Sequence, residues 1–226
     1  MYMSRARLLP EAVLDKSFNN VGSSYNIHRL VWSLFSKGSD DERIFLYRQE
    51  SDGTVPKFYI VSENEPKDES GSWDIDVKSY EPVLRPGQEL SFSLRANPIV
   101  SKRDENGKQH RHDVVMDEKF CMKKENSGKD NYSHVSEIVQ QKGVEWLQKK
   151  AENSGFSIEE EQVRADGYCN HIFYKPKGKH NISFNTIDFT GVLTVTDPEL
   201  FQKVLFKGIG PAKGFGCGLL MVRSIR

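Results

Sequence analysis

One predicted helix carries side chains that can move protons and bind phosphate. Within SSYNIHRLVWSLF, apolar residues recur at the spacing of a helix face that packs on a sheet. The opposite face presents a phenol, an imidazole, a guanidinium and an indole, from Tyr25, His28, Arg29 and Trp32. A histidine titrates near neutral pH, so it can accept or donate a proton in catalysis. The same four residues also suit an ordinary surface or a contact between domains, and both interpretations stay open at this point.

A glycine-rich segment near the C-terminus is the second candidate for phosphate binding. It reads GIGPAKGFGCGLLMV over residues 208–222, with glycines at Gly208, Gly210, Gly214, Gly216 and Gly218. Glycine has no Cβ, so such a loop can lie close to a ligand and direct its N–H groups at a phosphate, and Lys213 adds a cation. A tight turn is the alternative explanation of the glycines.

The elements beside this segment argue against a nucleotide site. DPELFQKVLFKG predicts a helix that begins at Asp197 and ends at Gly208, and LLMVRSI predicts a buried strand. Nucleotide-binding loops run in the other order, from a strand into a helix whose N-terminus holds the phosphate. We therefore expect no nucleotide cofactor.

Possible metal ligands occur in two groups, His110, His112 and Cys121, and Cys169 with His171. Neither group has the paired spacing of a structural zinc site. The sequence therefore predicts neither a metal nor any other cofactor.

A basic turn, KPKGKH, contributes a third set of cations, Lys175, Lys177 and Lys179. Such a turn is commonly a solvated hairpin tip, and it can also contact a nucleic-acid backbone. A further basic stretch, with Lys102 and Arg103, precedes an Asn-Gly pair that is typical of a hairpin turn.

Composition limits the classes of protein to consider. The chain has 226 residues and no net charge, so affinity for nucleic acid must come from local basic patches. Its three cysteines are an odd number without the spacing of a disulfide framework. No apolar segment resembles a signal peptide or reaches membrane-spanning length, so we expect a cytoplasmic protein without a membrane anchor.

The order of predicted elements in the first half is that of a ferredoxin-like domain. A strand in MYMSRARLL, the helix at about 24–36 and a hairpin around SDGT come first. Residues 63–82 are acidic and rich in serine, and they predict an irregular or short helical crossing. QELSFSLRANP then predicts the last strand of this domain. We therefore predict that the first domain comprises residues 1–98.

A second unit of similar plan is expected at residues 136–226. A basic hairpin and a polar connecting segment precede it at 99–135, and within them residues 117–134 are expected to be a mobile insertion. It begins with a helix from about 136 to 153. Strands follow in GFSIEEEQVRA, HIFYKPKGKHNISF and FTGVLTVT, and then the C-terminal helix, glycine-rich segment and strand. No sequence repeat relates the halves.

The string GIGPAKGFGCGLL resembles the C-terminal signature of the CasE family, the CRISPR repeat-processing endoribonucleases of the Cascade system. Agreement extends in order through MYMSRARL, YNIHRLVWSLF, LRPGQELSFSLRANPI, GVEWLQKK and FTGVLTVTDPEL, and is weak at 50–80 and 104–134. The resemblance implies an α+β fold of two tandem ferredoxin-like (RRM-like) domains, each an antiparallel sheet with helices on one face. It also implies binding to the hairpin of CRISPR precursor RNA, cleavage on its 3′ side, retention of the mature crRNA hairpin and assembly with other Cascade subunits.

For the site, the resemblance implies that His28 and Tyr25 take part in cleavage. RNA cut without metal is attacked by its own 2′-hydroxyl, which requires proton transfer and stabilisation of charge on the phosphate. We assign proton transfer to His28 and positioning to Tyr25, whose ordinary pKa near 10 makes it a poor base. The expected RNA-binding residues are Arg29, Lys102, Arg103, Lys175, Lys177, Lys179, Gly208, Gly210, Lys213, Gly214 and Gly216.

Two other functions are compatible with this fold. A non-catalytic RNA-binding subunit would not need a histidine at position 28. A metal-dependent nuclease would be expected to show clustered aspartates and glutamates at strand ends, and none is visible in the sequence.

Overall fold

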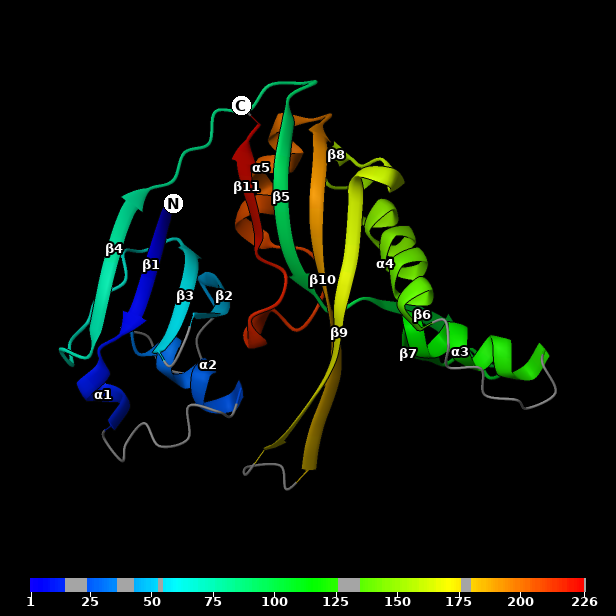
Figure 1. Ribbon diagram of the computed structural model, residues 1–226, viewed down its shortest axis with the longest axis horizontal. Helices are drawn as coiled ribbons and strands as arrows, with labels where there is room; N and C mark the ends of the chain where they lie inside the picture. The colour runs from blue at the N-terminus through cyan, green and yellow to red at the C-terminus, as the bar shows by residue number, and fades with distance from the viewer. Residues whose placement is uncertain (15–23, 36–42, 53–54, 126–134, 176–179, 226) are drawn as a thin grey trace.

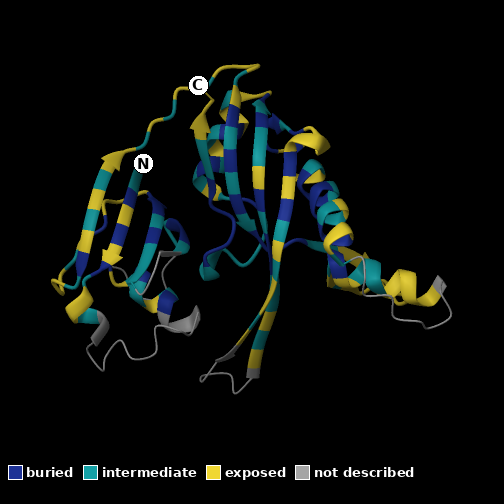
Figure 2. Cartoon of the chain, viewed as in Figure 1, coloured by how far each residue is buried: buried dark blue, intermediate teal, exposed yellow. Residues whose placement is uncertain are grey.

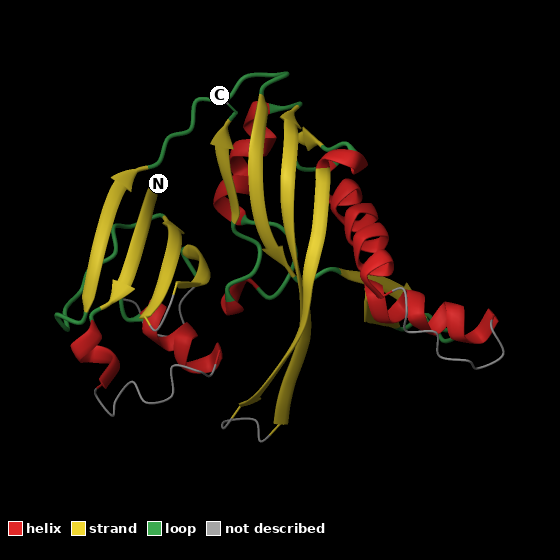
Figure 3. Cartoon of the chain, in the orientation of Figure 1, coloured by secondary structure: helices red, strands yellow, loops and turns green. Residues whose placement is uncertain are grey.

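The computed structural model describes residues 1–14, 24–35, 43–52, 55–125, 135–175 and 180–225. Within them the backbone forms two large antiparallel sheets that stand side by side, joined by a connection that runs from β4 to β5, and one two-stranded sheet (Figures 1 and 3).

The first sheet has the strand order β2-β3-β1-β4. Its elements are β1 (Tyr2–Leu8), α1 (Pro10–Leu14), α2 (Ser24–Trp32), β2 (Phe45–Asp52), β3 (Val55–Ser62) and β4 (Trp73–Ser79). The predicted helix and hairpin are thus confirmed. Ile27, Val31 and Leu34 of the helix face and its following turn are buried against one face of this sheet, as their spacing requires.

The predicted irregular crossing at 63–82 is wrong, because it contains strand β4. The segment WDIDVKS alternates apolar and polar residues, and Trp73 joins the core while Asp74 and Asp76 form ion pairs with Arg7 and Arg5 of β1. Figure 2 shows the resulting alternation, between buried and exposed residues along β1 and, after buried Trp73, between intermediate and exposed residues along β4. The acidic composition of this segment led to the wrong prediction, although its apolar and polar residues alternate as expected for a strand.

The second sheet has the order β11-β5-β10, and β10 pairs on its other edge with β9 and, at its end, with β8. Its strands are β5 (Glu89–Ala96), β8 (Phe156–Ser157), β9 (Val163–Lys175), β10 (His180–Val195) and β11 (Leu220–Ser224). Helices α4 (Val135–Ala151) and α5 (Pro198–Lys207) supply the two helices of this unit. The strands β9 and β10 form one long hairpin that extends past the other strands (Figure 1), where three shorter strands were predicted.

Both sheets have the ferredoxin-like strand order. If the strands of each unit are numbered from its own first strand, the second sheet has the order 4-1-3-2. The first sheet has the order 2-3-1-4, which is the same order read from the opposite edge. The second unit has a helix at each of the two crossovers, and the first has α2 at its first crossover. The predicted tandem α+β fold is confirmed.

The strand at 89–96 belongs to the second sheet, so its predicted place in the first domain is wrong. It pairs with β10 and β11, and Leu90, Phe92 and Leu94 enter the core of the second unit. β4 takes the position in the first sheet that was expected for this strand. The boundary predicted at residue 98 therefore lies after the first strand of the second unit.

Between β5 and α4 lie a hairpin and a helix. The hairpin, β6 (Ile99–Arg103) with β7 (Gln109–Asp113), is confirmed, and Gly107 takes the positive φ of 77° that its turn requires. The polar insertion expected at 117–134 is helical in its first part, because α3 spans Val114–Glu125. Its remainder, residues 126–134, lies outside the described residues.

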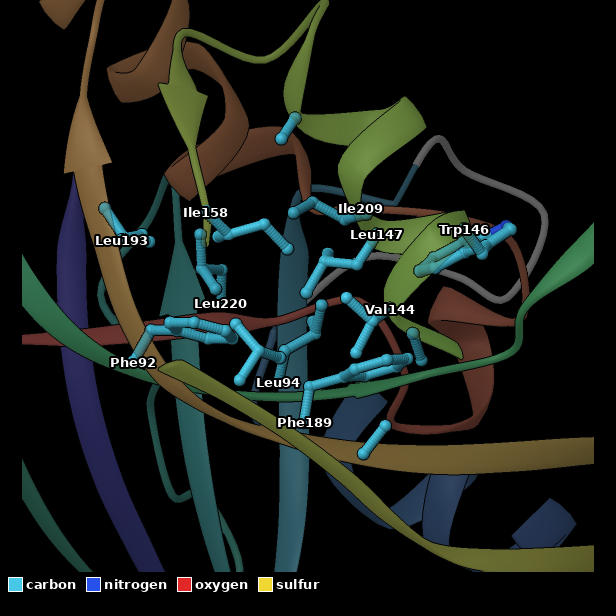
Figure 4. Close-up of a cluster of buried hydrophobic side chains, with 14 of the residues drawn as sticks. Phe92, Leu94, Val144, Trp146, Leu147, Ile158, Phe189, Leu193, Ile209 and Leu220 are labelled. Carbon is cyan, nitrogen blue, oxygen red and sulfur yellow. The ribbon is translucent and has the colours of Figure 1, made fainter. Parts of the chain in front are cut away.

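The core of the second unit fixes the start of the glycine-rich segment. Figure 4 shows Val144, Trp146 and Leu147 of α4 packed with side chains of the sheet and with Ile209. Asp197 caps the N-terminus of helix α5, where its side chain accepts a hydrogen bond from the Leu200 N–H at 3.0 Å, and Gly208 caps the C-terminus with φ of 74°. A smaller cluster of Leu46, Val61 and Leu219 joins the two sheets.

Candidate active site

His28 projects from α2 toward the glycine-rich segment. Its ring is half-buried and lies 5.7 Å from the Trp32 ring, edge to face, and 6.2 Å from the ring of Phe215. The buried residues on the other side of α2 hold this helix against the first sheet, so His28 is presented from a fixed support.

The turn Lys213–Phe215 faces His28 and brings the two units together at this point. The Tyr47 hydroxyl of β2 donates a hydrogen bond to the Gly214 carbonyl at 3.0 Å. A Cβ placed on Gly214 would lie 3.5 Å from Cε1 of His28 and 3.6 Å from Nη1 of Arg43. His28 and Arg43 therefore border the same small space, which the missing side chain of Gly214 leaves open.

The other glycines serve the course of the chain. Gly208, Gly210 and Gly216 have φ between 74° and 82°, which favours glycine. Beside their β-positions lie protein atoms: the Gly218 carbonyl and Leu46 at Gly208, Trp146 at Gly210 and Tyr47 at Gly216. Protein atoms thus occupy the space beside the β-positions of these three glycines, where contact with RNA was predicted. Gly214 is the glycine whose β-position faces the candidate site.

Among the described residues, cationic side chains gather at this site and no acidic side chain offsets their charge. Burial lowers the pKa of His28, the backbone of Gly214 acts in the opposite direction, and Arg43 lowers it further. Burial also lowers the pKa of Arg43 and that of Lys213, where Arg43 adds to the effect. Within the part of the chain that the structure describes, no carboxylate contributes to any of these three pKa values. Such a cluster suits an anionic ligand, because a phosphate would compensate the buried charge.

An aromatic row continues from this site onto the long hairpin. Phe215 lies 5.4 Å from Phe184 of β10, whose ring stacks on His171 of β9 at 5.0 Å. The Nε2 of His171 is 2.9 Å from the Thr186 hydroxyl. Together with Trp32 and His28, these rings form a wall that connects α2 with β9 and β10.

Three of the predicted site residues meet here. His28, Lys213 and Gly214 come together. Arg29 is exposed on α2, and Lys102 on β6 pairs with Asp117 at 2.7 Å, next to exposed Arg103. The remaining positions lack described side chains: Tyr25 and Lys175 have only their backbone described, in α2 and β9, and Lys177 and Lys179 lie outside the described residues.

Arg43 and Tyr47 are the site residues that sequence reasoning missed. Both lie in RIFLYRQE, which was interpreted only as a strand. Tyr47 is buried with Phe45 on the helix side of β2, and burial raises its pKa, so the hydroxyl stays protonated as a donor. The inward alternation of Phe45 and Tyr47 was a usable signal for Tyr47, whereas only the fold brings Arg43 to His28.

The described residues contain no group of three or more His, Cys, Asp or Glu side chains placed to hold a metal ion. His110 instead pairs with Asp104 at 2.8 Å. Within the same residues, no helix has the length and apolar character needed to cross a membrane.

A family model described as CRISPR associated protein matches residues 1–224. The CRISPR system Cascade subunit CasE of Escherichia coli is 30% identical over 203 residues, which cover 89% of this chain and 92% of the relative. The CRISPR-associated endoribonuclease Cse3 of Thermus thermophilus is 26% identical over 219 residues, covering 90% and 91%.

Solved structures show the same fold. A structure of Cse3 bound to a 19-nucleotide RNA matches with a TM-score of 0.71 and 25% identity, covering 99% of this chain and 100% of that one. A Thermus thermophilus Cse3 structure with an RNA representing a pre-cleavage complex matches with a TM-score of 0.65, 25% identity and the same coverage.

Proposed function

Because the chain belongs to the CasE family of CRISPR-associated proteins, we propose that it is an endoribonuclease that binds the repeat hairpin of CRISPR precursor RNA and cleaves on its 3′ side. The observation that carries this proposal is the meeting of His28, Arg43 and Gly214 around one small space, where no carboxylate of the described residues offsets the charge. A relative at 25% identity is solved with bound RNA, which supports RNA as the ligand.

Cleavage proceeds by transphosphorylation within the RNA. The 2′-hydroxyl oxygen forms a bond to the adjacent phosphorus while the bond from phosphorus to the 5′-oxygen breaks. The products are a 2′,3′-cyclic phosphate, which can open to a 3′-phosphate, and a 5′-hydroxyl. The lowered pKa of His28 favours the neutral imidazole near pH 7, so His28 is suited to accept the proton of the 2′-hydroxyl.

Arg43 and Lys213 stabilise the negative charge that develops on the phosphate. Among the described residues, no carboxylate raises the pKa of the Arg43 guanidinium, and no group makes a hydrogen bond with its buried Nε. It is therefore available to a phosphate oxygen, for which its planar donors are well matched. Tyr25, one turn before His28 on α2, is assigned to positioning the ribose or phosphate.

After cleavage, the hairpin product remains bound. The protein then joins a Cascade complex, since its E. coli relative is described as a Cascade subunit. Basic side chains on the two hairpins, β6 with β7 and β9 with β10, supply contacts to the RNA backbone. Cys121, Cys169 and Cys217 are free thiols, which fits work in a reducing cytoplasm.

The test is single-turnover cleavage of a repeat hairpin in EDTA by the wild type and by His28→Ala. Loss of proton transfer should slow cleavage by about 10² to 10⁴-fold while hairpin affinity is retained. His112→Ala is the matched control, because this histidine is exposed on β7 and should leave the cleavage step unchanged. Equal cleavage by wild type and His28→Ala would contradict the assignment, and binding without any cleavage by the wild type would identify a non-catalytic RNA-binding subunit.

A further inference from the structure

The candidate active site is divided between the two units, so its geometry depends on how they are aligned. His28 and Arg43 come from the first unit, and Lys213 and Gly214 come from the second. The covalent connection leaves the first sheet from β4, which is the edge strand opposite to β2 (Figure 1). Contacts between side chains, and not the course of the connection, must therefore fix the alignment at the site.

Strand β2 is the edge of the first sheet that meets the second unit, and three consecutive residues contact that unit from both faces of the strand. On the helix side, the Tyr47 hydroxyl donates to the Gly214 carbonyl at 3.0 Å. On the other face, Leu46 packs with Leu219 in the small apolar cluster, and Arg48 follows on the same face. Apolar packing has no preferred direction, so it holds the units together, whereas directional hydrogen bonds fix their register.

Arg48 supplies such a bond across the boundary between the units. Its Nη1 donates to the hydroxyl of Ser93 on β5 at 2.6 Å, and the residue is only 8% exposed. The Glu50 carboxylate, on the same face of β2, stands 3.4 Å from the Arg48 Nε and holds the guanidinium in place. A second, longer contact runs the other way, from the Arg95 Nη1 to the carbonyl of Gln49 at 3.4 Å. Side chains from both units thus tie β2 to β5.

The arginines at this boundary are paired with carboxylates of the protein, in contrast to the cations of the candidate site. A cavity of about 430 Å³ lies beside them and is lined by Arg48, Gln49, Glu50 and Arg95. Arg95 makes two hydrogen bonds of 2.7 Å with Asp188, and Arg48 pairs with Glu50. Because each arginine has its own carboxylate, the cavity does not require an anionic ligand. The hydrogen bond that Arg48 makes across the boundary therefore serves the alignment of the protein itself.

We propose that Arg48 is a positioning residue for the cleavage reaction. Its hydrogen bond to Ser93 sets the register of the two units, and thereby brings the imidazole and guanidinium of the first unit to the glycine-rich turn of the second. Arg48 acts through these groups and does not touch the RNA. A displacement of about 1 Å typically costs about 10²-fold in rate, so a small change of register is sufficient to slow cleavage. This inference rests on the proposed function, because it assigns Arg48 to the alignment of that site.

The test removes the acceptor of this hydrogen bond and leaves Arg48 in place. Ser93→Ala deletes one hydroxyl, Ser93→Thr keeps it, and Arg48→Met deletes the donor. Ser91→Ala is the matched control, because Ser91 lies on the same face of β5 and donates to the Arg223 carbonyl at 3.2 Å within the second unit.

Each variant is assayed in EDTA for single-turnover cleavage of the repeat hairpin at saturating protein and over a range of pH. Affinity is measured separately by fluorescence anisotropy, with a hairpin that carries a 2′-deoxy nucleotide at the cut site. Thermal melting is the check on folding.

Ser93→Ala should cleave about 10 to 10²-fold more slowly than the wild type at unchanged hairpin affinity. The shape of its pH profile should stay that of the wild type, because His28 keeps its surroundings. Ser93→Thr and Ser91→Ala should cleave like the wild type. Arg48→Met combined with Ser93→Ala should be no slower than the slower single variant, since both changes remove the same bond.

A wild-type cleavage rate in Ser93→Ala would overturn the inference alone, and this result decides the question even where Arg48→Met does not fold. A loss of rate that only follows a loss of hairpin affinity or of folded protein would also overturn it. Absence of cleavage by the wild type would contradict the proposed function together with this inference, which distinguishes the two failures.

Discussion

Replacing Gly214 with alanine separates the site from the fold. The new Cβ would lie 3.5 Å from His28 and 3.6 Å from Arg43, which are ordinary contact distances, and Gly214 is not among the residues with positive φ. The free energy of unfolding should therefore change by less than about 1 kcal/mol. The added methyl group fills the space that His28 and Arg43 border, so a phosphate there must move by about 1 Å, which typically costs about 10²-fold in rate.

The assay is single-turnover cleavage of the repeat hairpin by Gly214→Ala, with thermal melting measured in parallel. Gly218→Ala is the contrasting variant: φ at Gly218 is 86° and its Cβ would come within 2.6 Å of the Ile209 carbonyl, so this substitution should lower the melting temperature clearly. A Gly214→Ala protein that melts like the wild type and cleaves at the wild-type rate would refute the assignment of this space to the phosphate.

Three further predictions follow from charge. Arg43→Ala should reduce the cleavage rate by about 10² to 10³-fold, and Arg43→Lys, which keeps the positive charge, should retain part of the wild-type rate. Equal cleavage rates for Arg43→Ala and Arg43→Lys would contradict a phosphate bound by Arg43. Burial lowers the pKa of both His28 and His171, so the unfolded chain binds more protons than the folded one and the melting temperature should fall as pH drops below about 6.5. The fall should be smaller in His28→Gln, which lacks one of these two groups. A melting temperature that does not depend on pH would contradict this prediction. Replacing Lys175, Lys177 and Lys179 together should flatten the salt dependence of hairpin binding by about 0.7 to 0.9 in log–log slope per lost phosphate contact, whereas unchanged slopes would indicate a solvated tip.

Local patterns predicted the elements that carry their own signals. Helix α2 follows from its apolar face, and α5 from Asp197, Pro198 and Gly208 at its ends. These features depend on neighbours within a few residues, so one sequence is sufficient to find them. Both helices also support the candidate site, where His28, Lys213 and Gly214 meet.

Strand partners could not be predicted in the same way. The segment at 89–96 has the alternation of a strand with one buried face, and that pattern suits either sheet. Only the pairing with β10 and β11 assigns it to the second unit. Arg43 was missed for the same reason, because its place beside His28 depends on how β2 and the glycine-rich segment meet across the two units. Contacts between distant segments decide both cases.

The most direct test of metal-independent cleavage by the 2′-hydroxyl uses a repeat hairpin with one 2′-deoxy nucleotide at the cut site. In EDTA, the wild-type protein should bind this RNA as tightly as the all-ribose hairpin and leave it intact, while it cuts the all-ribose hairpin to products with 2′,3′-cyclic phosphate and 5′-hydroxyl ends. Cutting of the 2′-deoxy hairpin would show that an external water is the nucleophile and would contradict the role assigned to His28.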